Sequence, residues 1–265
     1  MKEQTFKTQW GGKELSIKVG KLAQQAGGSC LVQYGDTVVL ATATMSSYKR
    51  DGLKWFPLMV DFEEKMYAAG RIKGSRFMKR EGRPTDEAVL TSRTIDRALR
   101  PLFDHTIRND IQVIVTCLTF DGENDPDVVG LIGASCALHM SDIPWNGPIG
   151  TIRIGQVEGE WVVNPTYEER ENSVLDLMFS GTKDKVIMVE AGANEATEEV
   201  VLGGFWHGMD QMEAPIKLIE EVRAAVGKEK RDMTASEDAE DQEVVDTRKN
   251  IEDLARPFIT EQVKE

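Results

Sequence analysis

The sequence has few of the residues that build disulfides and metal sites. Only three cysteines and three histidines occur among 265 residues. Cys30, Cys117 and Cys136 are far apart, form no CxxC pair and have no histidine at ligand spacing. We therefore expect buried, reduced thiols, with neither a disulfide framework nor a structural zinc site.

Long hydrophobic runs are also missing. No run approaches about 18 apolar residues, the length that a membrane span needs. Residues 1–9 are charged and polar, unlike a signal peptide. We expect a cytoplasmic protein with no membrane contact. Its 40% hydrophobic and 29% charged residues suit a globular protein with one large domain or two small ones.

Two further motif classes do not fit the sequence. It has no GxxxxGK[ST] loop, and the glycines at 130 and 133 suit close helix packing better than a dinucleotide loop. The acidic turn at 121–127 lacks the spacing of a calcium loop and its closing glutamate. We predict no metal ligand in this chain.

The net charge of -13 is not evenly distributed, and one segment of the chain is basic. An acidic chain is a poor general coat for nucleic acid, since affinity for phosphates comes mainly from lysine and arginine. Between Arg71 and Arg108, however, ten basic residues outnumber five acidic ones. A basic patch on an otherwise acidic protein indicates that an anionic ligand binds at one particular place.

The residue pattern predicts an α+β fold, because strands come first, helices are interspersed and a helical segment closes the core. A β-meander is expected at 5–9, 14–19, 30–33 and 37–44, and a long loop at 66–83. A helix capped by Thr85 should run to about Leu99. The remaining expected elements are a strand at 110–120, a helix at 128–140, a hairpin of 149–155 with 161–164, strands at 175–180 and 185–190, and helix at 195–226 broken near Gly203-Gly204 or Pro215.

The helix after Pro84 carries the most informative pattern. Arg93, Arg97 and Arg100 follow one another at i, i+4 and i+7, so they form one stripe, opposite the apolar residues that anchor the helix. Arginine forks match phosphate oxygens, so the stripe favours a ligand that carries phosphate groups. We expect Asp96 to weaken the stripe little, because it lies to one side. The alternative is a solvated face with i,i+4 ion pairs.

The loop before this helix strengthens the functional interpretation. Phe77 is followed by Lys79 and Arg80. An aromatic ring beside adjacent cations suits an unpaired nucleic-acid strand. Each base stacked on such a ring contributes about 1–3 kcal/mol, and the cations neutralise the phosphate backbone.

These motifs resemble the first core domain of the polynucleotide phosphorylase family, in order along residues 2–227. The matching runs are AAGRI at 68–72, FMKREGRP at 77–84, IDRALRPLF at 95–103, IGAS at 132–135 and IPWNGPIG at 143–150. The resemblance implies an RNase PH-like α+β core at 1–227, followed by a linker and the start of a truncated all-helical domain at 228–265.

Family membership implies a homotrimeric ring whose channel admits single-stranded RNA. A loop that usually reads Phe-Phe-Arg-Arg constricts that channel, and Phe77-Met78-Lys79-Arg80 matches it here. Partners in an RNA-degradation complex are possible. The RNA-binding set implied is Phe77, Lys79, Arg80, Arg93, Arg97 and Arg100.

The implied reaction is attack of inorganic phosphate, the co-substrate, on the 3′ end of RNA, with release of nucleoside diphosphates. In the family, Mg²⁺ and phosphate are bound by a second core. Here Asp125-Pro126-Asp127 stands in place of a serine-rich phosphate loop, Met178 replaces a lysine, and Arg170 replaces an acid. We therefore expect no catalytic residue in this chain, a structural role for Asp176, and no activity of the fragment alone.

Two other functions are consistent with the sequence. One is a non-catalytic RNA-threading subunit of an exosome-like ring, which shares the fold. The other is a small-molecule α+β enzyme with an incidental arginine patch, which would bind no RNA at moderate salt.

Overall fold

The computed structural model describes residues 2–50, 52–72, 74, 82–233 and 242–263. Phe77, Lys79 and Arg80, three of the predicted RNA contacts, lie outside the described residues. The chain forms two compact units, Met1–Arg231 and Asp232–Glu265. The first unit contains both sheets, and the second contains the helix α6 (Gln242–Gln262), which has Pro257 inside it.

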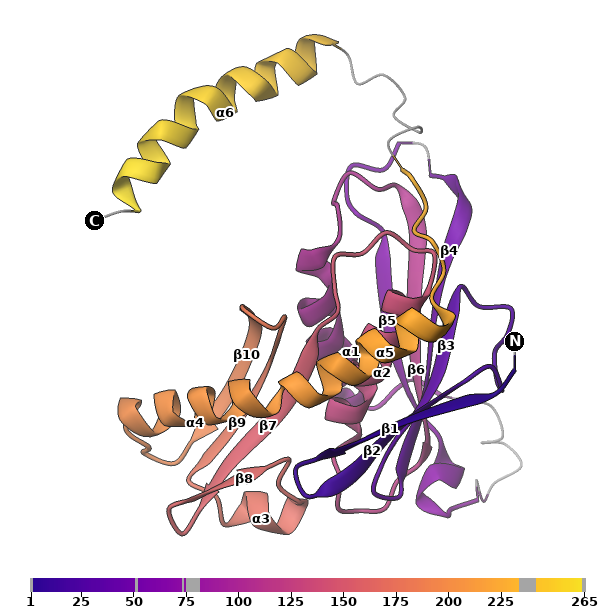
Figure 1. The fold of residues 1–265 in the computed structure, drawn as a ribbon, viewed down its shortest axis with the longest axis vertical. Helices are drawn as coiled ribbons and strands as arrows, with labels where there is room; N and C mark the ends of the chain where they lie inside the picture. Colours follow the sequence, from indigo (N-terminus) through magenta and orange to yellow (C-terminus); the bar gives the residue numbers. More distant parts are fainter. Residues whose placement is uncertain (1, 51, 73, 75–81, 234–241, 264–265) are drawn as a thin grey trace. The chain divides into compact units, whose positions relative to one another are not determined.

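The larger sheet has six strands in the order β1-β2-β3-β4-β6-β5 (Figure 1). Its first four strands form the predicted antiparallel meander. We did not predict β5, which runs parallel to β6 at the edge of the sheet. Three acidic residues in seven lower its β propensity, and its pairing partner comes much later in the chain. The strands are β1 (Gln4–Trp10), β2 (Lys13–Val19), β3 (Gly28–Tyr34), β4 (Thr37–Lys49), β5 (Leu58–Glu64) and β6 (Asn109–Thr119).

The helix α1 (Asp86–Leu99) begins and ends where the sequence predicts. The Thr85 hydroxyl accepts a hydrogen bond from the Ala88 amide at 3.0 Å, which confirms the predicted cap. A 3-10 turn, η3 (Arg100–Leu102), follows directly. The segment predicted as a loop from residue 66 begins instead with another 3-10 turn, η1 (Met66–Ala69), which ends at Gly70 with a φ of 67°.

The helix α2 (Pro126–Met140) is the centre of the core, and its residues are buried from Val128 to Met140. It packs against β3, β4 and β6. A Cβ on Gly133 would lie 3.0 Å from the Ala41 Cβ, and one on Gly130 would lie 3.1 Å from a Val115 methyl. These close approaches confirm that the two glycines serve helix packing.

The smaller sheet has the order β10-β9-β7-β8. Its strands are β7 (Gly150–Val157), β8 (Glu160–Val163), β9 (Leu175–Gly181) and β10 (Val186–Ala193), and β7 with β8 forms the predicted hairpin. A short helix, α3 (Tyr167–Glu171), was not predicted. Thr166 and Glu169 form a capping box at its start, so the sequence did carry a signal for it.

The closing helical segment divides into α4 (Glu198–Gln211) and α5 (Glu213–Val226). The break is at Met212, near Pro215, which was one of the two predicted positions, and the helix continues through the other, Gly203-Gly204. Gly204 continues the helix because α4 lies close to the smaller sheet, where an added Cβ would lie 3.1 Å from a Leu175 methyl. Pro215 is in the first turn of α5, where no hydrogen bond is lost through its missing N–H.

Residues 228–231, which we expected to begin a linker, contact the C-terminal end of α2. The Lys228 amide donates to the Met140 carbonyl at 2.9 Å. Lys230 Nζ donates to the carbonyls of Leu138 and Ser141 at 2.7 and 2.9 Å. Donors from the following segment thus satisfy carbonyls that the end of a helix leaves without partners.

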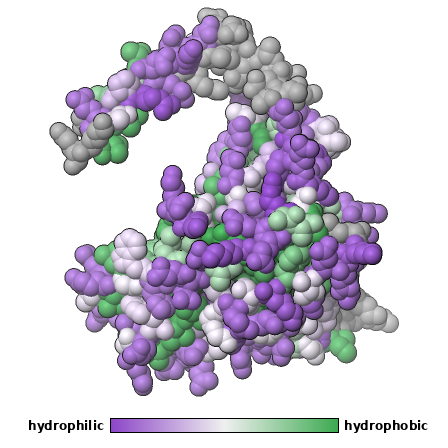
Figure 2. Space-filling model, viewed as in Figure 1, coloured by the Kyte–Doolittle hydropathy of each residue, from purple (hydrophilic) through white to green (hydrophobic). Residues whose placement is uncertain are grey.

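The surface is mainly hydrophilic on the face shown in Figure 2, with smaller hydrophobic areas between. Within the described ranges, no helix is both long enough and apolar enough to cross a membrane.

Candidate nucleic-acid interface

One face of α1 presents the first two arginines of the predicted stripe to solvent. Arg93 and Arg97 are exposed, and Ile95 and Leu99 are buried. The predicted amphipathic orientation is therefore confirmed for this part of the helix. Arg93 has no hydrogen bond or ion pair to any residue that the structure describes.

Arg97 forms an ion pair with a residue of the smaller sheet. Its Nη2 donates to Oε2 of Glu190, on β10, at 3.2 Å. The Thr94 hydroxyl donates to the same oxygen at 3.2 Å. The Arg97 and Glu190 side chains are 54% and 56% exposed, so water screens their attraction.

Arg100 is engaged differently from the other two arginines. Its guanidinium donates four hydrogen bonds, two to the carboxylate of Asp96 at 3.0 and 2.8 Å and one each to the carbonyls of Phe56 and Leu58 at 3.4 and 3.2 Å. It also lies over the Phe56 ring. The prediction that Asp96 has little influence on the stripe is wrong, because an acid four residues before an arginine lies on the same side of a helix.

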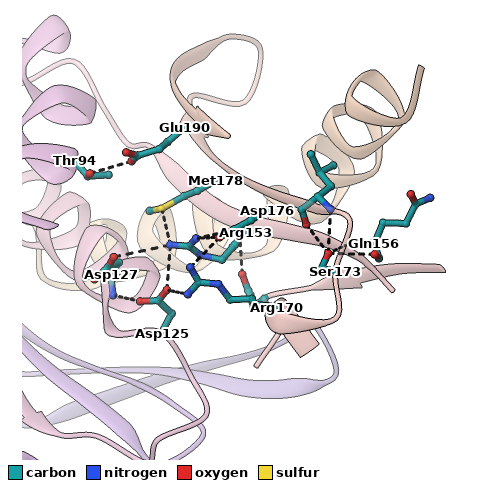
Figure 3. Close-up of polar contacts among 12 residues, drawn as sticks. Thr94, Asp125, Asp127, Arg153, Gln156, Arg170, Ser173, Asp176, Met178 and Glu190 are labelled. Atoms are coloured by element: carbon teal, nitrogen blue, oxygen red, sulfur yellow. Dashed lines mark hydrogen bonds and ion pairs between the residues drawn. The ribbon is translucent and has the colours of Figure 1, made fainter. Parts of the chain in front are cut away.

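Beside α1, two arginines and three aspartates form a continuous ion-pair network (Figure 3). Arg153 Nη1, from β7, donates to both oxygens of Asp176, on β9, at 2.8 and 3.0 Å. Its Nη2 lies 3.1 Å from Asp125 and 3.9 Å from Asp127, at the start of α2. Arg170, from α3, bridges Asp125 and Asp176 at 2.8 and 2.9 Å.

The charges and burial of the network shift the pKa values of Asp176 and Asp127 in opposite directions. Burial opposes charge on Asp176, but Arg153 and Arg170 outweigh it and lower the pKa of this carboxyl. Burial and the neighbouring Asp125 charge raise the pKa of Asp127 to about 7, although Thr91 donates a hydrogen bond to it at 2.8 Å. Asp127 is thus the member that most readily takes up a proton.

These contacts leave little capacity for an external ligand. Both guanidinium groups are engaged by carboxylates, and Arg153 Nη2 also contacts the Met178 sulfur at 3.5 Å. Asp176 is held between two arginines, which is the arrangement expected of the structural role predicted for it. Among the described residues, no group of three or more His, Cys, Asp or Glu side chains could hold a metal ion.

Sequence reasoning missed Arg153, the central residue of the network. The available signal was a charged residue between Ile152 and Ile154, in a strand with no other charged residue. Its side chain is only 10% exposed, and such an arginine needs carboxylate partners.

Comparison of the sequence with known protein families identifies the family of this chain. Residues 11–144 match the sequence model of the 3′ exoribonuclease family, domain 1, and residues 147–205 match domain 2 of the same family. The chain belongs to the 3′ exoribonuclease family. This assignment confirms the RNase PH-like α+β fold predicted from the sequence.

Two curated proteins to which this chain is similar carry the same name. The polyribonucleotide nucleotidyltransferase of Alkaliphilus oremlandii is 51% identical over 236 residues, which are 89% of this chain and 33% of the relative. That of Clostridioides difficile is 45% identical over 259 residues, 98% of this chain and 35% of the relative. The resemblance drawn from the motifs is therefore confirmed, and the chain spans about a third of the length of these relatives.

A solved structure supports the fold alone. The crystal structure of rice (Oryza sativa) Rrp46 superposes with a TM-score of 0.62 over 85% of this chain and 96% of that one, at 16% identity.

Proposed function

We propose that the chain is the RNA-contacting N-terminal part of a polyribonucleotide nucleotidyltransferase, a phosphorolytic 3′-to-5′ exoribonuclease of single-stranded RNA. The observation that carries the proposal is the exposed arginine face of α1 beside a site closed by its own ion pairs, in a chain 45–51% identical to proteins of that name. Such a chain guides RNA and leaves the chemistry to another part of the enzyme.

The α1 face supplies contacts to the RNA backbone. Arg93 and Arg97 reach solvent and present planar guanidinium groups that match phosphate oxygens. Arg100 belongs to the proposed set as well, and its four hydrogen bonds also position the end of α1. Phe77, Lys79 and Arg80 are proposed to stack on bases and neutralise phosphates ahead of this face.

Inorganic phosphate, the proposed co-substrate, and Mg²⁺ do not fit the ion-pair network that the described residues form around Arg153. An anion arriving at Arg153 or Arg170 would have to displace carboxylates already 2.8–3.1 Å from them. A cation would meet aspartates whose charge the arginines already offset. Both ligands therefore belong to the part of the enzyme that carries out the chemistry, and this chain has no catalytic residue.

The remaining features of the proposal concern assembly. We propose a cytoplasmic homotrimeric ring with possible partners in RNA degradation, with the first core at 1–227 and the start of a helical domain at 228–265. The relatives at 45–51% identity favour this function over a non-catalytic exosome-like subunit, because the likeness to Rrp46 at 16% identity supports the fold alone.

Two measurements test the proposal. Fluorescence anisotropy should show that the 265-residue chain binds a labelled oligoadenylate with an affinity that falls as salt rises. Arg97→Ala should weaken binding and reduce the slope of log affinity against log salt by about 0.7, the loss of one phosphate contact. An absence of RNA binding at moderate salt would favour the small-molecule alternative.

The second measurement is phosphate-dependent release of nucleoside diphosphates from RNA with Mg²⁺. The chain alone should be inactive. A chimaera that joins it to the remaining two thirds of the Clostridioides difficile relative should be active. Release by the chain alone would show that a catalytic centre exists here and that the closed-site interpretation is wrong.

A further inference from the structure

One carboxylate oxygen of Glu190 accepts hydrogen bonds from two residues of α1. Its Oε2 accepts from the Thr94 hydroxyl and from Arg97 Nη2, both at 3.2 Å. Figure 3 shows the first of these contacts, with Glu190 reaching from β10 toward α1. The proposed phosphate-binding face therefore carries a carboxylate of its own.

The main chain of Glu190 and one hydrogen bond to its carboxylate do not depend on Arg97. Glu190 pairs with Met178 in the ladder between β10 and β9, which fixes its main chain. Thr94, the other hydrogen-bond donor, is buried on α1. When Arg97 turns toward another anion, Glu190 consequently stays close to it.

The ion pair is weak enough for RNA to compete with it. Both side chains are more than half exposed, and pairs of this kind contribute little in water. A phosphate that binds Arg97 would nevertheless meet the charge of Glu190, which lowers the gain. Arg93 has no such carboxylate within the part of the chain that the structure describes.

We propose that Glu190 competes with RNA phosphate for Arg97 and thereby lowers the RNA affinity of this face. This inference rests on the proposed function. In an enzyme that moves along its substrate, a weakened backbone contact would favour release of each phosphate after it is bound.

Glu190→Gln tests the inference, because the amide oxygen can still accept from Thr94 while the negative charge is lost. Affinity of the 265-residue chain for a labelled oligoadenylate should rise about 2- to 5-fold, the range of a surface ion pair. Glu220→Gln, on the exposed side of α5, changes the net charge equally and is the matched control. It should alter affinity by less than the Glu190 change.

The double variant Arg97→Ala/Glu190→Gln separates competition from general repulsion. Relative to Arg97→Ala, the added glutamine should give no more gain than the control does. If Arg97→Ala weakens binding but Glu190→Gln behaves like Glu220→Gln, the inference is overturned and the proposed RNA contact stands. If Arg97→Ala leaves binding and its salt slope unchanged, the proposed RNA contact fails, and the inference fails with it.

Discussion

Replacement of Arg153 by methionine should strongly destabilise the first compact unit. The side chain is 10% exposed and lies within 4 Å of three carboxylates, at 2.8 Å from Asp176, 3.1 Å from Asp125 and 3.9 Å from Asp127. Methionine has a similar length but no charge, so three acids would share Arg170 alone. Removal of one partner from a buried ion pair costs about 3–5 kcal/mol. For a unit of this size, that loss lowers Tm by roughly 6–20 °C.

The pH dependence gives the same variant a second, more specific readout. Without Arg153, the folded-state pKa of Asp127 rises further above its unfolded value near 4, and the pKa of Asp176 is no longer held as low. The stabilisation that comes from protonated Asp127 is fully present at low pH and is lost as pH rises through its folded-state pKa. The deficit relative to the unmodified protein should therefore be larger at about pH 8 than at about pH 5.

Urea unfolding followed by far-UV circular dichroism at both pH values measures this difference. Arg50→Met is the matched control, because Arg50 pairs with Asp110 at 3.2 Å but is 61% exposed. It should cost less than about 1 kcal/mol. A loss below about 1 kcal/mol for Arg153→Met, or an equal loss at both pH values, would refute the argument that charge compensation holds this region together.

Three further predictions concern Asp127, Gly208 and Arg100. Asp127→Asn should gain about 2–3 kcal/mol relative to the unmodified protein as pH rises from about 5 to 8, because the unmodified protein loses stability as pH rises from the unfolded pKa of Asp127 near 4 to its folded pKa of about 7; an unchanged difference in urea unfolding would contradict this. Gly208→Ala should cost about 1–3 kcal/mol in urea unfolding, since its Cβ would lie 2.7 Å from the Phe179 ring, and a gain typical of helical alanine would show that α4 can shift. Arg100→Ala should lower Tm more than Arg97→Ala, because four hydrogen bonds are lost rather than one exposed pair, and equal losses would disprove the anchoring role.

Local signals were sufficient to predict much of the fold. Thr85 placed the start of α1 correctly because a cap depends only on the residues beside it. The four-strand meander followed from short apolar runs with turns between them. Pro215 likewise indicated the break at Met212, whereas the continuation of α4 through Gly203-Gly204 depends on close packing against Leu175 and Trp161, which the sequence does not show.

Parts of the candidate site formed by residues close together in the sequence could be predicted. Ion pairs between residues far apart in the sequence could not. Spacing alone identified the stripe of Arg93, Arg97 and Arg100. Asp125 and Asp127 were recognised as standing in place of a phosphate loop, but their partner Arg153 comes from a distant strand, and no local pattern connects them. The contact of Arg97 with Glu190 joins residues 93 positions apart and is visible only in three dimensions.

The contacts of residues 228–231 with the end of α2 decide where the first unit can be separated from the rest of the chain. A shortened protein that ended at Gly227 would lose Lys228 and Lys230, and the Leu138 carbonyl would lose its lysine donor. The central helix would then fray from its C-terminal end. The shortest recombinant product that keeps this helix intact ends at Arg231.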